Sequence, residues 1–205
     1  MKKILISKKA LHLSLLFGLL CAIFSSFAHF NAACDDLRAN VLRLHIIANS
    51  DSALDQEVKL KIRDRLLQES TTLFSGADSV ENAIFIANTK KDTVREIANS
   101  VLKENNFPYE AKVSVEKHYF NTRVYENFTL PAGTYDSLVI TLGKAEGKNW
   151  WCVIFPEVCI PAAKATSLEV SATKESCKIA YSPKRYVMKF WSVEKYEDLK
   201  NLIKK

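Results

Sequence analysis

Five polar residues surround the junction at which an apolar run of the chain gives way to a charged run. Within LHIIANSDSALDQEVKLKIRD they are His45, Asn49, Ser50, Asp51 and Asp55. A histidine close to serines and carboxylates is typical of nucleophilic or acid–base catalysis. Amide and carboxylate oxygens are also the ligands that calcium prefers. The stretch is therefore a catalytic cluster, a cation site, a protein-binding surface or only a well-formed helix start.

The catalytic and metal interpretations each lack an essential part. Asp51 and Asp55 lie about one helical turn apart, but an aspartic dyad needs two loops that bring the carboxylates together. Neither GxSxG nor HExxH occurs in the chain. The spacing also lacks the glycine and terminal glutamate of an EF-hand loop. We therefore expect no enzyme activity, no catalytic residue, no metal and no other cofactor.

Helix capping explains the same residue types. The sequence Asn49-Ser50-Asp51-Ser52 is typical of a turn with an N-cap, and Ser52 with Asp55 and Gln56 resembles a capping box with a shifted partner. The positive end of a helix also favours carboxylates in its first turn. We expect a strand within 36–48 and a helix over about 53–69. His45 then belongs to the core or holds the turn.

The predicted helix 53–69 is apolar on two sides. One stripe contains Leu54, Val58, Ile62 and Leu66, and a second contains Leu60 and Leu67. A helix that is apolar on two sides packs on two sides, so the charged residues between the stripes should lie near other parts of the protein.

A binding surface is the alternative to a purely structural role for this region. In that case the turn and the charged sides of the helix contact a partner protein. Tandem tryptophans at a strand start alternate between faces, so one is expected in the core and the other is a candidate anchor at an interface, with both in the core as the favoured alternative. The candidate partner-binding residues are His45, Asn49, Ser50, Asp51, Asp55, Lys59, Arg63, Trp150 and Trp151.

The first residues have the layout of a secretory signal. MKKILISKK carries four lysines and no acid, an apolar segment follows, and the first acidic residue is Asp35. Cleavage is expected after Ala28, with Ala33 as second choice, and an uncleaved anchor is the alternative. A lipid anchor at Cys34 is disfavoured by Asn31. The four lysines account for most of the net charge of +6, so the charge does not indicate nucleic-acid binding.

An exported chain is permitted to form disulfides. Cys152 and Cys159 enclose VIFPEV and are the candidate pair. The alternative is two buried thiols, since a reduced cysteine packs as a small hydrophobe. No CxxC occurs, so the spacing does not favour zinc.

The remaining pattern predicts one α+β domain over 36–205, after a signal segment over 1–28. We expect a mixed or antiparallel sheet with helices mostly on one face. Its other predicted parts are one helix over 79–105, strands within 109–130, an ambiguous helix or strand over 134–143, a strand from Trp150, a surface loop or lid over 161–178, a strand over 186–191, and a helix over 193–205 capped by Ser192.

Three long motifs resemble the stage II sporulation protein R family. They are LRLHIIANSDSALDQEVKLKIRDRLL, the FNTRVY…LPAGTYDSL segment and GKNWWCVIFPEVC, and the tail KFWSVEKYEDL is also similar. The resemblance extends from about Val41 to Cys159. Asn121 stands where the family pattern has proline, which affects a turn, and the 161–182 segment matches nothing in that pattern.

The resemblance implies a signalling role. It implies a protein exported from the forespore into the space between the forespore and mother-cell membranes. There it would activate a membrane-embedded aspartic protease of the mother cell, which cleaves the sigma-E precursor. The protease would be the partner, nucleic acid would not be one, and the membrane would be met only through the N-terminal segment. The alternatives are a secreted cell-envelope hydrolase and a structural envelope protein.

Overall fold

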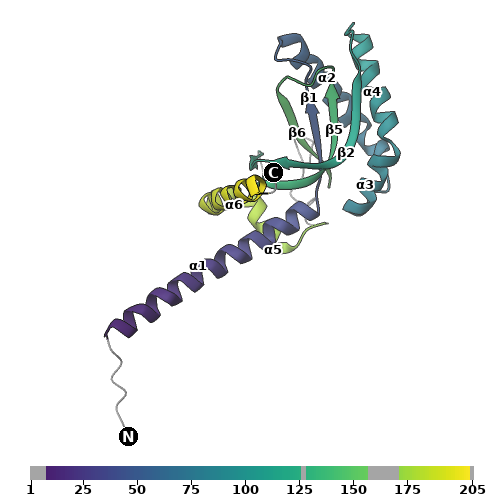
Figure 1. The fold of residues 1–205 in the computed structure, drawn as a ribbon. Coiled ribbons are helices and arrows are strands. Elements are labelled where there is room, and N and C mark those ends of the chain that lie inside the picture. Colours follow the sequence, from purple (N-terminus) through teal and green to yellow (C-terminus); the bar gives the residue numbers. More distant parts are fainter. Residues whose placement is uncertain (1–7, 126–127, 157–170, 204–205) are drawn as a thin grey trace.

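The computed structural model describes residues 8–125, 128–156 and 171–203. The helices are α1 (Lys8–Ala39), α2 (Ala53–Leu73), α3 (Val80–Thr89), α4 (Lys91–Glu104), α5 (Lys174–Tyr181) and α6 (Pro183–Ile203). The strands are β1 (Leu42–Ile47), β2 (Ala111–Phe120), β3 (Arg123–Val124), β4 (Thr129–Leu130), β5 (Gly133–Leu142) and β6 (Asn149–Phe155). Figure 1 shows α1 projecting from the rest of the chain as one long helix.

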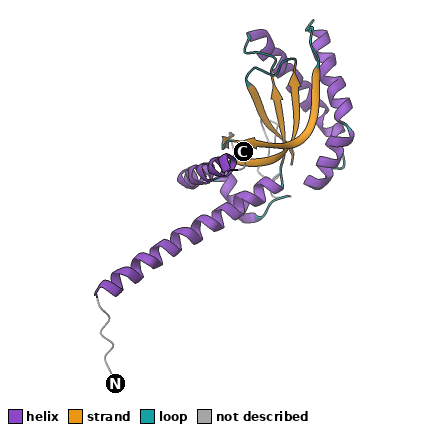
Figure 2. Cartoon of the chain, viewed as in Figure 1, coloured by secondary structure: helices purple, strands orange, loops and turns teal. Residues whose placement is uncertain are grey.

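Four strands form a mixed sheet in the order β2-β5-β1-β6. Strand β1 is parallel to β5 and antiparallel to β6, and β2 is antiparallel to β5. Strands β3 and β4 form a separate two-stranded ribbon. The predicted α+β class with a mixed sheet is confirmed, and the ambiguous segment 134–143 lies within strand β5 (Figure 2).

The alternation of β1 assigns its side chains to two different cores. Leu44 and Ile46 pack with Val58 and Ile62 of α2 in the larger cluster, which α4 completes. Arg43 and His45 point to the opposite face, because successive strand residues alternate. That face meets the end of α1 and α5, where Leu37 packs with aromatic residues of β2 and β5.

The N-terminal half of helix α1 is apolar and exposed, and its C-terminal part packs against the folded domain. Its apolar window has a mean hydropathy of 2.0 and none of it is buried, so it is long and apolar enough to cross a membrane. The helix continues without interruption past Ala28 to Ala39, and Phe30, Cys34 and Leu37 are buried in the domain. The apolar N-terminal helix is thus compatible with the predicted signal segment.

Helix α2 begins as predicted. Ser52 is its N-cap, and the Ser52 side chain accepts a hydrogen bond from the backbone N–H of Asp55. The helix extends to Leu73, beyond the predicted end. Of the predicted first stripe, Leu54 is exposed, whereas Val58, Ile62 and Leu66 are buried.

Several predicted elements were wrong. The helix expected over 79–105 is divided into α3 and α4 at Lys90, whose Nζ donates to Leu73 O at 2.7 Å and so fixes the break against the end of α2. The predicted loop over 161–178 includes the start of α5, and its residues 161–170 lie outside the described part. The strand expected within 36–48 is confirmed as β1, which begins at Leu42 because Asp36 still belongs to α1.

The strand predicted over 186–191 belongs to α6, and Ser192 lies inside that helix rather than at its cap. Aromatic and β-branched residues favour a strand locally. Here Phe190 and Val193, three residues apart, pack together with Phe30 of α1. This tertiary contact has helical spacing and overrides the local preference.

Candidate interaction site

The carboxylate of Asp55 holds the turn between β1 and α2. Asp55 is only 5% exposed and lies in the first turn of α2. Its Oδ2 accepts hydrogen bonds from Asn49 Nδ2 at 2.9 Å and from the Ser50 hydroxyl. Its Oδ1 accepts one from the Tyr109 hydroxyl. A residue that resembled a catalytic carboxylate therefore joins the helix start, the preceding turn and the start of β2.

These hydrogen bonds also determine the charge of Asp55. Burial alone would raise the pKa of this carboxyl, but the hydrogen bonds from Ser50, Tyr109 and Asn49 outweigh burial and hold its pKa below the usual value. Burial, followed by the bond to Asp55, raises the pKa of Tyr109. At neutral pH the pair is therefore a carboxylate and a neutral phenol.

A second set of contacts joins the same turn to the connection between β5 and β6. Asn49 Oδ1 accepts a hydrogen bond from the backbone N–H of Lys144 at 2.9 Å, and Asp51 Oδ1 accepts one from that of Lys148 at 2.7 Å. Lys59 Nζ donates to Lys148 O at 2.8 Å. The name "turn clamp" is used below for Asn49, Ser50, Asp51, Asp55 and Lys59 with the 143–148 connection.

The turn clamp leaves no room for a side chain at Gly147. An added Cβ there would lie 2.2 Å from the Ser50 carbonyl oxygen. The backbone N–H of Gly147 donates to Ala48 O at 2.9 Å, so the two backbones run in direct contact. The turn and the connection form one rigid unit at this end of the sheet.

Arg63 and Trp150 pair beside the helix-covered face. The guanidinium carbon of Arg63 lies 4.3 Å from the centroid of the Trp150 ring, which is a cation–π arrangement. Arg63 also forms an ion pair with Asp64 at 2.6 Å. Both Arg63 and Trp150 are half-buried. The expectation that charges on α2 lie near other protein holds for Lys59 and Arg63.

His45 and Trp151 lie on the opposite face of the sheet. Their rings stack with centroids 3.8 Å apart, and the ring of His118 lies 4.5 Å from that of His45. His45 is 1% exposed, and its Nε2 is 3.0 Å from Asn149 Oδ1. Burial, with smaller contributions from His118 and the nearby arginines Arg43 and Arg123, lowers the pKa of His45 to about 4. His45 is therefore a neutral core histidine at physiological pH.

The nine predicted residues thus form three groups rather than one site. The turn clamp holds Asn49, Ser50, Asp51, Asp55 and Lys59 together. Arg63 with Trp150, and His45 with Trp151, lie on opposite faces of the sheet. The fully buried side chains among them do not reach the surface, whereas Asp51 is exposed and the two tryptophans are half-buried. Whether any of the nine contacts a partner stays a prediction.

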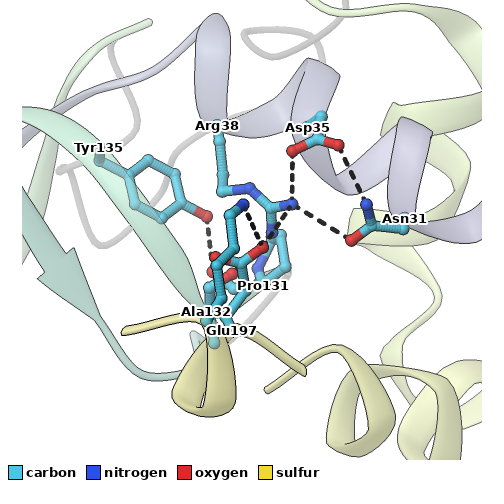
Figure 3. A network of polar contacts seen from close by, with 8 residues as sticks. Asn31, Asp35, Arg38, Pro131, Ala132, Tyr135 and Glu197 are labelled. Carbon is cyan, nitrogen blue, oxygen red and sulfur yellow. Dashed lines mark hydrogen bonds and ion pairs between the residues drawn. The ribbon is translucent and has the colours of Figure 1, made fainter. Parts of the chain in front are cut away.

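A polar network around Arg38 was not predicted. The LPAGTYD motif and Arg38 are its sequence elements, but they are distant along the chain. Arg38 is 8% exposed, and its guanidinium donates to Ala132 O and to Asp35 Oδ1, each at 2.7 Å (Figure 3). Glu197 Oε1 of α6 lies 3.7 Å from Arg38 Nη2. The network joins α1, α6 and the start of β5, so it fixes the N-terminal helix on the domain.

Arg43 is a second residue that the sequence reasoning missed. It is fully buried within the apolar run of β1, and its guanidinium carbon lies 3.9 Å from the Phe120 ring centroid and 4.9 Å from that of Tyr135. It also donates a hydrogen bond to the Tyr125 hydroxyl. Burial lowers the pKa of Arg43. Among the described residues, the groups that contact this cation are aromatic rings and a phenol, not a carboxylate.

Cys152 on β6 is disulfide-bonded. Cys159, the partner predicted from the sequence, lies outside the residues that the structure describes, so the predicted pairing stays a prediction. Cys34 of α1 is a buried thiol. Cys177 of α5 is buried in the cluster that contains Leu37 and Val41.

Comparison with known proteins gives a consistent result. The family model described as stage II sporulation protein R matches residues 38–165. A protein of Bacillus subtilis (strain 168) named Stage II sporulation protein R is 36% identical over 138 residues, which cover 67% of this chain and 62% of the relative. The match therefore spans less than two thirds of the relative's length. No solved structure matches the chain.

Proposed function

Because the chain belongs to the stage II sporulation protein R family, we propose that it is an exported signal that activates a membrane-embedded aspartic protease during sporulation. Family membership, through the match over residues 38–165, is the observation that carries this proposal, and it supports a role in sporulation. In the proposed sequence of events the forespore exports the chain into the space between the two membranes. The protease in the mother-cell membrane then cleaves the sigma-E precursor.

The architecture supports an exported signal. The exposed apolar half of α1 follows lysine-rich residues, and this order directs the chain that follows to the outer side of the membrane. Residues that resembled a catalytic cluster are occupied by structural hydrogen bonds, above all Asp55, whose two oxygens accept three side-chain bonds. They therefore shape a surface instead of providing a nucleophile or a base.

The surface shaped by the turn clamp is the contact that we assign to the protease. The exposed side chains there are those of Asp51, Lys144, Glu146 and Lys148. The backbone N–H groups of Lys144, Glu146 and Lys148 donate to Asn49 or Asp51, so little conformational entropy is lost when a partner binds. A ligand activates a protease by binding its active state better than its inactive state. A rigid surface with both charge signs suits such selection.

A reconstituted cleavage assay tests the proposal. The protease and the sigma-factor precursor are expressed together, and this chain is exported, omitted or retained inside by deletion of residues 1–28. Cleavage that depends on the exported form is the expected result. If cleavage is the same with and without the chain, while all components are present and folded, the activator function is wrong. The envelope hydrolase and envelope scaffold alternatives then remain.

A further inference from the structure

Helix α6 is apolar on two opposite sides. One side packs into the domain through Phe190 and Val193. The other is an exposed stripe at helical spacing, in which Met188 is 74% exposed and Trp191 is 57% exposed. The stripe contains Val187, Met188, Trp191, Leu199 and Leu202. A large exposed apolar patch marks a surface that another body covers.

The position of α6 indicates what that body is. Its inner side contacts α1 only a few residues after the apolar segment: the rings of Phe27 and Tyr196 are 5.8 Å apart, and Lys189 Nζ donates to Ser26 Oγ at 3.0 Å. Before these residues, α1 is apolar and exposed, as at Phe17 and Phe24. Figure 1 shows α6 beside α1 on the side toward which α1 leaves the domain. When α1 enters a membrane, α6 therefore lies at its surface.

The charged residues of α6 occupy both sides of the helix. Glu197 is buried beside Arg38, and Glu194 Oε2 accepts from a backbone N–H at 3.4 Å. The Asp198 side chain is 39% exposed and lies between the Tyr119 hydroxyl at 2.7 Å and Lys195 Nζ at 3.4 Å. Lys195 interrupts the exposed stripe and Arg185 is exposed near its start, whereas Lys189 reaches Ser26 of α1 and Lys200 pairs with Glu197 at 3.2 Å. An outer side with apolar residues, tryptophan and exposed cations is the pattern of a helix in a membrane interface.

We infer that α6 is an interfacial helix that lies in the surface of the same anionic membrane that α1 enters. The exposed stripe is immersed at the level of the headgroups and the first acyl carbons, and the exposed Arg185 and Lys195 lie at the level of the lipid phosphates. A groove of about 550 Å³ between α1 and α6, lined by Phe24, Phe27 and Lys189 among others, provides apolar space for an acyl chain. Lipid is the occupant that the position of the stripe favours, because the apolar segment of α1 leaves the domain beside α6.

This inference applies to the chain that retains residues 1–28, which is the uncleaved-anchor alternative to cleavage after Ala28. It goes beyond the expectation that the membrane is met only through the N-terminal segment. It does not depend on the protease-activating function. The consequence is a fixed orientation: α1, α6 and the Arg38 network hold the domain at a defined angle to the bilayer. The turn clamp, at another part of the domain, is then presented to the space outside the membrane.

Tryptophan quenching by brominated lipid tests the inference on the full-length chain. The chain is reconstituted into phosphatidylglycerol-containing vesicles whose acyl chains carry bromine near the headgroup. Of the 3 tryptophans, Trp191 is isolated by subtracting the emission of a Trp191→Phe variant. We expect the Trp191 emission to lie at short wavelength and to be largely quenched. A Met188→Glu/Leu199→Glu double variant should lose this quenching while its near-UV circular dichroism is unchanged.

A matched control is available on α3. Phe85 is 68% exposed and lies on the far side of the domain, so Phe85→Glu should leave the quenching of Trp191 unchanged. Trp191 emission at long wavelength without quenching would show that the stripe faces water, which overturns the inference. Short-wavelength emission that escapes quenching and varies with the ratio of protein to lipid would assign the stripe to a second copy, which also overturns it.

Discussion

The hydroxyl of Tyr109 donates a hydrogen bond to the carboxylate of Asp55 across 54 positions of sequence. The bond joins the residue that precedes β2 to the first turn of α2. Tyr109 also packs its ring 5.3 Å from that of Phe107. The hydroxyl and the ring therefore act separately, and a single substitution distinguishes them.

Tyr109→Phe should lower the free energy of unfolding by about 1.5–3 kcal/mol, because it removes a hydrogen bond to a buried charged group and keeps the ring. Denaturant titration of the full chain in detergent micelles measures the change. Tyr196→Phe is the matched control, since in the described part of the chain Tyr196 makes contacts through its ring, with Phe27 and Lys200, and none through its hydroxyl. Equal, small effects of both substitutions would show that Asp55 does not depend on Tyr109.

His45 should make the fold sensitive to acid. Its pKa is about 4 in the folded chain and 6.5 when unperturbed, so the unfolded state gains a proton first as the pH falls. The free energy of unfolding that depends on a neutral His45 is fully present above pH 6.5 and is lost between pH 6.5 and 4. The total is about 3 kcal/mol for a shift of this size. His45 Nδ1 is buried without a hydrogen-bond partner in the described residues, so a second ring proton would be uncompensated.

A His45→Phe variant tests this acid sensitivity because phenylalanine retains a ring against Trp151. The loss of unfolding free energy between pH 6.5 and 4 should shrink in the variant. It should not vanish, because burial also lowers the pKa of His118. Asp55 contributes in a separate window: its lowered pKa adds stability that is lost only as the pH falls below about 4. An undiminished loss in the variant would assign the sensitivity to other groups.

Gly133 should tolerate no side chain. Its φ is +143°, and an added Cβ would lie 2.4 Å from the Arg38 Cδ. Gly133→Ala must therefore displace Arg38 from Ala132 O, in addition to any backbone strain. Gly76→Ala is the matched control, since Gly76 also has a positive φ of +84° but nothing within 4 Å of the added atom. Thermal melting should show a loss of about 1–2 kcal/mol at Gly76 and a larger loss at Gly133. Equal losses would show that Arg38 moves freely.

Features that depend on neighbouring residues were predictable from the sequence, whereas contacts between distant segments were not. The cap at Ser52 was correct because capping depends on neighbours three residues away. The hydrogen bonds that Tyr109 donates to Asp55 and Lys59 donates to Lys148 O join segments distant in sequence. The residues of the 44–64 stretch alone therefore do not predict them. For the same reason His45 was recognised as a candidate core residue, but its stacking on Trp151 was not.

Helix α6 shows that tertiary contacts can override the secondary structure predicted from local sequence. The run 186–191 has strand-forming residues, yet Phe190 and Val193 pack against Phe30, which lies near the N-terminal end of the chain. A single α1 that continues from the apolar segment into the core was likewise not foreseen. Phe30 and Leu37 of this helix follow the expected cleavage site and are buried in the domain. Cleavage after Ala28, with an uncleaved anchor as the alternative, stays a prediction.

The surface assigned to the protease is tested most directly at Lys148. Its backbone N–H and carbonyl belong to the turn clamp, through Asp51 and Lys59, but its side chain is exposed. Lys148→Glu therefore reverses a surface charge and leaves these two backbone hydrogen bonds intact. We expect unchanged melting and a fall in protease activation of at most about fivefold, because one exposed charge contributes little. The fall should shrink at high salt, which screens such charges.

Lys91→Glu makes the same charge change at the exposed start of α4, away from the turn clamp, and should activate as well as the unchanged chain. Asp51→Ala removes both an exposed charge and the bond to Lys148 N–H, so its effect on activation should exceed that of Lys148→Glu and be accompanied by a small loss of stability. If Lys148→Glu and Lys91→Glu reduce activation equally, net charge rather than the turn clamp determines the interaction. If a folded Asp51→Ala chain activates fully, the protease contacts another surface.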